Sequence, residues 1–172
     1  VTTMQMAEGL DTGDMLLTYE TKVGEKETAG ELFDRLAQSG AELLTQTLVK
    51  LDEIEPRPQD DAQSCYAHML DKQMAVIDWS KSAHEIDCLI RGLNPWPSAF
   101  SHLNGKTLKI WEASVEEENG EKKAPGTVLQ ADTKGFRIQT GEGILKIDTL
   151  QLEGKNEWMR RHFYVAIRWK KG

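Results

Sequence analysis

One short connection near the start of the chain carries the residue types of an acid–base site. The stretch MQMAEGLDTGDMLL, residues 4–17, places Glu8, Asp11 and Asp14 between two apolar runs. A carboxylate can accept a proton from a reacting group, or it can hold a neighbouring histidine in its cationic form. An aspartate close before a glycine is more typical of a turn in which its side chain bonds the local backbone. The stretch alone therefore predicts an acidic turn, with catalysis by Asp11 as the alternative.

A second set of candidates consists of basic side chains in the later part of the chain. They fall on strand-like segments or on the turns between them, and they are Lys106, Lys109, Lys134, Arg137 and Lys146. Such residues could line a groove that faces phosphates, although taken alone they are more often solvated. The formal net charge of −7 argues against indiscriminate binding of nucleic acid, so any polyanionic partner is expected in this later part.

The cysteines and histidines predict neither a metal site nor a disulfide. Cys65 and Cys88 form no CxxC pair, and His68, His84 and His102 stand apart without ligand spacing. The chain also has no apolar run long enough to span a membrane. We therefore expect free thiols, no bound metal and a cytoplasmic protein.

Two strands and one or two helices are expected to position the acidic loop. VTTMQM and MLLTYE have the residue types of strands on either side of it. Thr28 and Glu31 form a capping-box pattern, which begins a helix that runs to about Lys50 unless Gly40 interrupts it. The apolar positions of this helix, expected to pack on the two strands, are Leu32, Phe33, Leu36, Leu43, Leu44 and Leu48.

The later elements predict a small β-barrel or sandwich. Pro56 and Pro58 end the helix and begin a polar linker. A second capping box, Ser82 with Glu85, begins a helix that NPWP ends. Four segments that alternate apolar and polar residues follow, and they are TLKIWEASV, GTVLQAD, GFRIQT and GILKIDTLQL. The tryptophans at 79, 96 and 111 are expected to anchor the core, with ligand stacking by Trp96 as the less favoured alternative.

Several motifs, taken together and in this order, resemble one family. MQMAEGLDTGDML, IDWSKSAHEIDCLIRGLNPWP, LKIWEA, PGTVL and TGEGILKI are similar to the C-terminal part of bacterial methionyl-tRNA formyltransferases, over Val1 to about Gly154. The resemblance implies a multidomain α/β plus β chain. It assigns residues 1–55 to the C-terminal part of a Rossmann-like formyltransferase domain, residues 56–76 to a linker, and residues 77–172 to an OB-like β-barrel domain that binds tRNA.

The resemblance also implies a reaction. The family transfers the formyl group of 10-formyltetrahydrofolate to the amino group of methionyl initiator tRNA. Its catalytic Asn, His and Asp match this chain at Asp11 alone, with Gly9 and Leu10 beside the folate cleft; the Asn and His belong to an upstream motif that these 172 residues lack. The chain opens inside an apolar segment, as a strand cut from a longer protein would. We therefore expect this polypeptide to be inactive by itself and the parent enzyme to be a monomer that does not bind membranes.

Two other functions stay open. One is another folate-dependent formyltransferase or hydrolase that shares the aspartate loop, although DWS and NPWP favour the tRNA enzyme. The other is a noncatalytic RNA-binding module made from the barrel. Binding of initiator tRNA without any binding of folate would support the second.

The end of the chain departs from the family pattern. Residues 156–172, NEWMRRHFYVAIRWKKG, have aromatics and arginines where a short helix with a glycine stop is expected. A reverse translation displaced by one frame can restore a helix-like ending, so we predict that these residues are out of frame. The alternative is a divergent basic strand that helps to hold tRNA.

Overall fold

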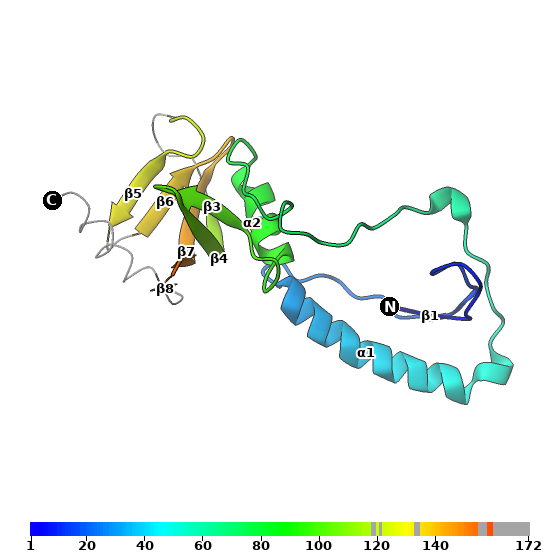
Figure 1. The fold of residues 1–172 in the computed structure, drawn as a ribbon. Helices are drawn as coiled ribbons and strands as arrows, with labels where there is room; N and C mark the ends of the chain where they lie inside the picture. The colour runs from blue at the N-terminus through cyan, green and yellow to red at the C-terminus, as the bar shows by residue number, and fades with distance from the viewer. Residues whose placement is uncertain (118–119, 121, 133–134, 155–157, 160–172) are drawn as a thin grey trace. The chain divides into compact units, whose positions relative to one another are not determined.

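The computed structural model describes residues 1–117, 120, 122–132, 135–154 and 158–159 (Figure 1). They belong to two compact units, Val1–Met69 and Leu70–Gly172. Lys134 lies outside the described residues, and so does the predicted out-of-frame segment 156–172 apart from residues 158 and 159. Within the part of the chain that is described, no helix is both long and apolar enough to cross a bilayer.

The first unit is a short hairpin with one long helix. Strands β1 (Thr2–Met4) and β2 (Met15–Thr18) pair antiparallel, and helix α1 (Ala29–Val49) follows. Two short 3₁₀ helices, Leu51–Glu53 and Asp61–Gln63, come after it. The predicted capping box is confirmed, because the Thr28 hydroxyl accepts from the Glu31 N–H at 3.3 Å and the Glu31 carboxylate accepts from the Thr28 N–H at 2.8 Å. The helix runs through Gly40 without a break.

The predicted apolar face of α1 is only partly correct. Leu43 and Thr47 are buried and Leu32 and Leu36 are half-buried, but the side chains at 33, 44 and 48 are exposed, Phe33 by 72%. At about 100° per residue, Phe33, Leu44 and Leu48 lie on a strip beside the one that meets the hairpin. Two strands of three and four residues are too narrow to cover both strips.

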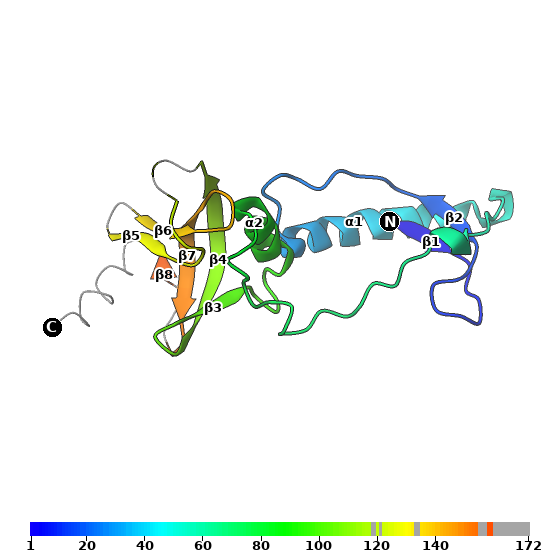
Figure 2. The ribbon, with the colours of Figure 1, turned by 90° about the horizontal axis from the view of Figure 1, so that it is seen from above.

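The second unit is a helix packed on a curled antiparallel sheet (Figures 1 and 2). Helix α2 (Ala83–Gly92) begins at the predicted capping box, where the Ser82 hydroxyl accepts from the Glu85 N–H at 3.2 Å. The strands are β3 (Phe100–Leu103), β4 (Lys106–Glu116), β5 (Val128–Asp132), β6 (Gly135–Gln139), β7 (Ile144–Leu152) and β8 (Trp158–Met159). Their order is β3-β4-β7-β6-β5, and β8 pairs with β7. The predictions of β4 to β7 are confirmed, whereas β3 was not predicted.

The core of this unit lies between α2 and one face of the sheet. Ile86 and Ile90 of α2 join Ile110 of β4 and Leu145 and Ile147 of β7 in one buried cluster. Residues that alternate with these along the strands are only half-buried, Lys146 among them. The alternation therefore assigns the basic side chains of β6 and β7 to the opposite face of the sheet.

Trp96 is not a core anchor, so that prediction is wrong. Its side chain is 59% exposed, whereas Trp79 packs against the core and its Nε1–H donates to the Ser101 hydroxyl at 3.0 Å. The loop that carries Trp96 closes on itself, because the Ser98 N–H donates to the Leu93 carbonyl at 2.9 Å. Neighbouring residues 97–99 are buried in its place.

Candidate functional site

The acidic loop between β1 and β2 requires a glycine at position 13. The Gln5 N–H donates to the Asp14 carbonyl at 2.9 Å, which draws the two sides of the loop together. A Cβ added at Gly13 would lie 1.6 Å from the Gln5 carbonyl oxygen, so no other residue fits this backbone. The close approach sets the path of residues 9–12, where the candidate catalytic side chain lies.

Asp11 has a fixed backbone and an uncommitted carboxylate. Its φ of 54° is in the left-handed region, which aspartate tolerates better than most residues. The Gln59 side-chain amide donates to the carbonyls of Asp11, at 2.8 Å, and Gly13, at 2.7 Å. Among the described residues, none gives the exposed Asp11 carboxylate a hydrogen bond. The loop is therefore held by groups other than this carboxylate, which is free to meet a substrate or a partner side chain.

The neighbouring candidates Gly9 and Leu10 are also exposed, Leu10 by 95%. The Thr12 hydroxyl donates to the Gly9 carbonyl at 3.1 Å and closes the tip of the loop. An apolar side chain this exposed has no packing role within the described unit. Contact with another surface, such as a bound ligand, is the role that its position leaves open.

Two residues that sequence reasoning assigned to the linker support this loop. Arg57 exchanges backbone hydrogen bonds with Met15, at 2.8 and 2.9 Å, and Gln59 donates to the loop as described above. No local pattern signals these contacts, because the partners lie more than forty residues apart along the chain. Arg57 and Gln59, at the start of this segment, therefore help to position the Asp11 loop.

The predicted phosphate-facing basic residues of the sheet are partly neutralised. Arg137 donates to both carboxylate oxygens of Glu116, at 2.6 and 2.9 Å, and to Gln130 at 2.6 Å. Hydrogen bonding to Arg137 lowers the pKa of Glu116, and the same bond raises the pKa of Arg137. Lys146, which lies opposite Arg137 in the β6–β7 register, pairs with Asp148 at 3.2 Å. This part of the sheet carries alternating charges instead of a basic strip.

Lys106 and Lys109 differ from these paired cations. Lys106 is exposed at the start of β4, and the ammonium of Lys109 lies 5.4 Å from the centroid of the Trp111 ring. Neither has a carboxylate within ion-pair distance among the described residues. The structure therefore separates the candidate cations into two that are paired and two that remain open to an anion.

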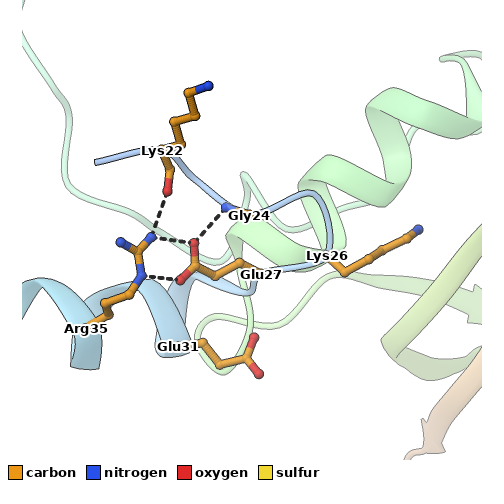
Figure 3. A pocket seen from close by; sticks show the side chains of 6 residues that line it. All are labelled: Lys22, Gly24, Lys26, Glu27, Glu31 and Arg35. Atoms are coloured by element: carbon orange, nitrogen blue, oxygen red, sulfur yellow. Dashed lines mark hydrogen bonds and ion pairs between the residues drawn. The ribbon is translucent and has the colours of Figure 1, made fainter. Parts of the chain in front are cut away.

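A charged pocket of about 580 Å³ lies where the segment before α1 meets the helix (Figure 3). Arg35 donates to both carboxylate oxygens of Glu27 at 2.8 Å and to the Lys22 carbonyl at 2.9 Å. The ammonium groups of Lys22 and Lys26 point away from this pair, so they do not converge on a common anion (Figure 3). The contacts of Arg35 with Glu27 and Lys22 thus hold the segment before α1 to the helix.

Acid should loosen this attachment. The hydrogen bond from Arg35 lowers the pKa of Glu27 from 4.5 to about 2. Because the folded pKa is depressed, the contribution of the pair to stability is complete above pH 4.5 and is lost as the pH falls through about 2. The protection factors of the amide hydrogens of residues 22–27, which correct for the pH dependence of intrinsic exchange, should fall over this interval, and Glu27→Gln should already show low protection above it. A loss of protection that is complete above pH 4.5 in the unmodified chain would contradict this.

No metal centre emerges from the described residues. Within them, no three histidine, cysteine, aspartate or glutamate side chains are grouped so that they could hold an ion. Cys65 and Cys88 are free and exposed. Among the described residues, the first unit carries several exposed carboxylates that accept no hydrogen bond, Asp11 among them, and the second unit carries aromatic and basic groups.

The second unit matches the family model described as formyl transferase, C-terminal domain, over residues 69–165, which is more than half of the chain. The chain belongs to this formyltransferase family. It is 53% identical over 156 residues to a curated methionyl-tRNA formyltransferase of Clostridium novyi, an alignment that covers 90% of this chain and 50% of that protein. The chain spans about half the length of the curated relatives it matches.

Solved structures show the same fold at low sequence identity. A methionyl-tRNA formyltransferase of Clostridium thermocellum matches with a TM-score of 0.57 and 20% identity, over 67% of this chain and 50% of that one. HypX of Aquifex aeolicus in complex with tetrahydrofolic acid matches with a TM-score of 0.67 and 20% identity, over 92% of this chain and 28% of that one. The curled sheet with its helix lies within the residues that the formyl transferase C-terminal domain model matches, and these structures share its fold.

Proposed function

We propose that this chain forms one half of an enzyme that formylates methionyl initiator tRNA with 10-formyltetrahydrofolate. The observation that carries the proposal is the 53% identity to a methionyl-tRNA formyltransferase over 156 residues. The acidic loop supports it, because its backbone is held in place while the Asp11 carboxylate stays uncommitted. The folate complex of HypX supports the choice of cosubstrate.

In this proposal each part of the chain has a role. Residues 1–55 complete a Rossmann-like catalytic domain, residues 56–76 link it to the second unit, and residues 77–172 form an OB-like barrel that binds the tRNA. Gly9 and Leu10 border the folate. The enzyme acts as a monomer in the cytoplasm and uses no metal.

Asp11 would act through a histidine supplied by the other half of the enzyme. Attack of the methionyl amine on the formyl carbon creates a tetrahedral oxyanion and an ammonium that must lose a proton. A carboxylate beside the imidazole favours its cationic form, which can donate to the oxyanion. The unengaged state of the Asp11 carboxylate is compatible with this role, since binding the imidazole would break no hydrogen bond within the described residues.

A chimaera tests the proposal. The 172-residue chain should not formylate charged initiator tRNA. Fusion to the N-terminal half of the Clostridium novyi relative, in which the family resemblance implies the catalytic Asn and His, should give formylation that depends on 10-formyltetrahydrofolate. Turnover by the 172-residue chain would disprove the requirement for a second half. A folded chimaera that binds tRNA, but that neither binds folate nor formylates the tRNA, would favour the noncatalytic RNA-binding module.

A further inference from the structure

The outward face of β3 and β4 gathers aromatic rings around a lysine. Phe100 lies directly opposite Lys109 in the β3–β4 register, so their side chains leave the sheet on the same side. His102 lies two residues further along β3, opposite Thr107, and Trp111 lies two residues further along β4, so the two rings stand on that same side at opposite ends of the Phe100–Lys109 pair. Leu108 and Ile110, which alternate with them, belong to the core. We call these four residues, Phe100, His102, Lys109 and Trp111, the aromatic face.

Contacts within the aromatic face keep its rings ordered. The rings of Phe100 and His102 meet edge to face with centroids 5.6 Å apart, and the Lys109 ammonium lies 5.4 Å from the Trp111 centroid. His102 is exposed, and the other three side chains are half-buried. Each ring therefore has one side supported by the protein and part of its surface open to solvent.

Trp96 extends this arrangement. The Asn94 side chain donates to the Trp111 carbonyl at 3.0 Å, which ties the loop of Trp96 to β4 beside the aromatic face. The Ser98 hydroxyl donates to the Pro95 carbonyl at 2.8 Å and fixes the other side of the loop. The indole of Trp96, 59% exposed, is thus an apolar ring that the protein holds at its surface without burying it.

This combination of groups suits unpaired nucleotides. Every base offers a face that stacks on an aromatic ring, and an adjacent cation attracts the phosphate that follows it. Lys109 is available for that role, because among the described residues it has no carboxylate partner, unlike Arg137 and Lys146. The bases of a double helix are already stacked on one another, so a duplex could place its phosphates on this surface but could not stack its bases on the aromatic rings.

We propose that the aromatic face, together with Trp96, binds unpaired nucleotides of an RNA by stacking their bases on Trp96 and His102 beside Lys109. The inference rests on the proposed function, since the RNA in question is the tRNA substrate. It adds that the contact is made to a single-stranded stretch of that tRNA and is made largely by rings.

Binding measurements on the 172-residue chain test it. The probes are methionyl initiator tRNA, a short single-stranded oligoribonucleotide and a blunt RNA duplex, each followed by fluorescence anisotropy. Trp96→Leu and His102→Ala should each weaken binding of the single strand about tenfold, as expected for the loss of one stacked base. Trp96→Phe and His102→Phe, which keep a ring, should stay near the unmodified affinity. Both positions are exposed, so the variants should fold.

The outcomes separate this inference from the proposed function. If the unmodified chain binds tRNA and both ring-deleted variants bind it equally well, the stacking surface is overturned and the proposed function is not. Unmodified chain that binds the single strand through the two rings but not the tRNA would support the surface and contradict the proposed substrate. Equal loss in the ring-deleted and ring-keeping variants would also overturn the inference, because shape instead of stacking would then explain the effect.

Discussion

Asp11→Asn in the chimaera with the Clostridium novyi N-terminal half should lower kcat/KM for formylation by about 10²- to 10⁴-fold, the usual contribution of the general acid–base catalysis that Asp11 would support through the histidine. An amide keeps the size of the carboxylate but carries no charge, so it no longer favours a cationic imidazole. Formylation of charged initiator tRNA, measured at saturating 10-formyltetrahydrofolate, gives the comparison.

The loss should come from chemistry and not from folding. Gln59 holds this loop through the carbonyls of Asp11 and Gly13, and none of these bonds uses the Asp11 side chain. The thermal unfolding midpoint of Asp11→Asn should therefore match that of the unmodified chimaera. Asp14→Asn is the matched control, because it removes a carboxylate from the same loop and should leave kcat/KM nearly unchanged. Equal losses in the two variants would show that the loop needs negative charge in general and would reject a specific role for Asp11.

Gly141→Ala should destabilise the second unit by about 3 kcal/mol, the upper part of the range for overpacking. A Cβ at this position would lie 1.8 Å from the Ser80 carbonyl oxygen. The backbone cannot move aside cheaply, because the Gly141 N–H donates to the carbonyls of Trp79, at 2.9 Å, and Lys81, at 2.8 Å. Urea unfolding followed by tryptophan fluorescence measures the change.

Gly92→Ala provides the control in the same unit. An added Cβ there meets nothing within 4 Å, and Gly92 is the last residue of α2 at an ordinary φ. Alanine should therefore raise stability by about 0.4–1 kcal/mol, because it restricts the unfolded chain without straining the folded one. If Gly141→Ala unfolds at the same urea concentration as the unmodified chain, the close approach to Ser80 does not constrain this position.

Features that depend on neighbouring residues were predictable from the sequence. Both capping boxes lie where the Thr28 and Ser82 patterns predicted them, because a capping box joins residues only three positions apart. Strands β4, β6 and β7 follow the alternation of apolar and polar residues, which reports burial of one face. Strand β3 was missed because its four residues have little alternation, and its pairing partners lie in β4 and around Val76.

The candidate site divides in the same way. Asp11 was identified from motifs, because residue identity and order alone carry a family resemblance. Which candidate cations are free to bind an anion could not be predicted. The sequence shows that Arg137 and Lys109 are basic, but not which of them pairs with a carboxylate. That Arg137 is engaged by Glu116 and that Lys109 lies over Trp111 became visible only in the folded sheet.

By itself, the sequence determined where the helices begin, which strands have one buried face, and to which family the motifs belong. Only the tertiary structure decided that Trp96 stays at the surface, that Gln59 holds the Asp11 loop, and that Glu116 neutralises Arg137. The last two contacts join residues 48 and 21 positions apart. Local propensities act over a few residues, whereas the approach of distant side chains depends on how the whole unit packs.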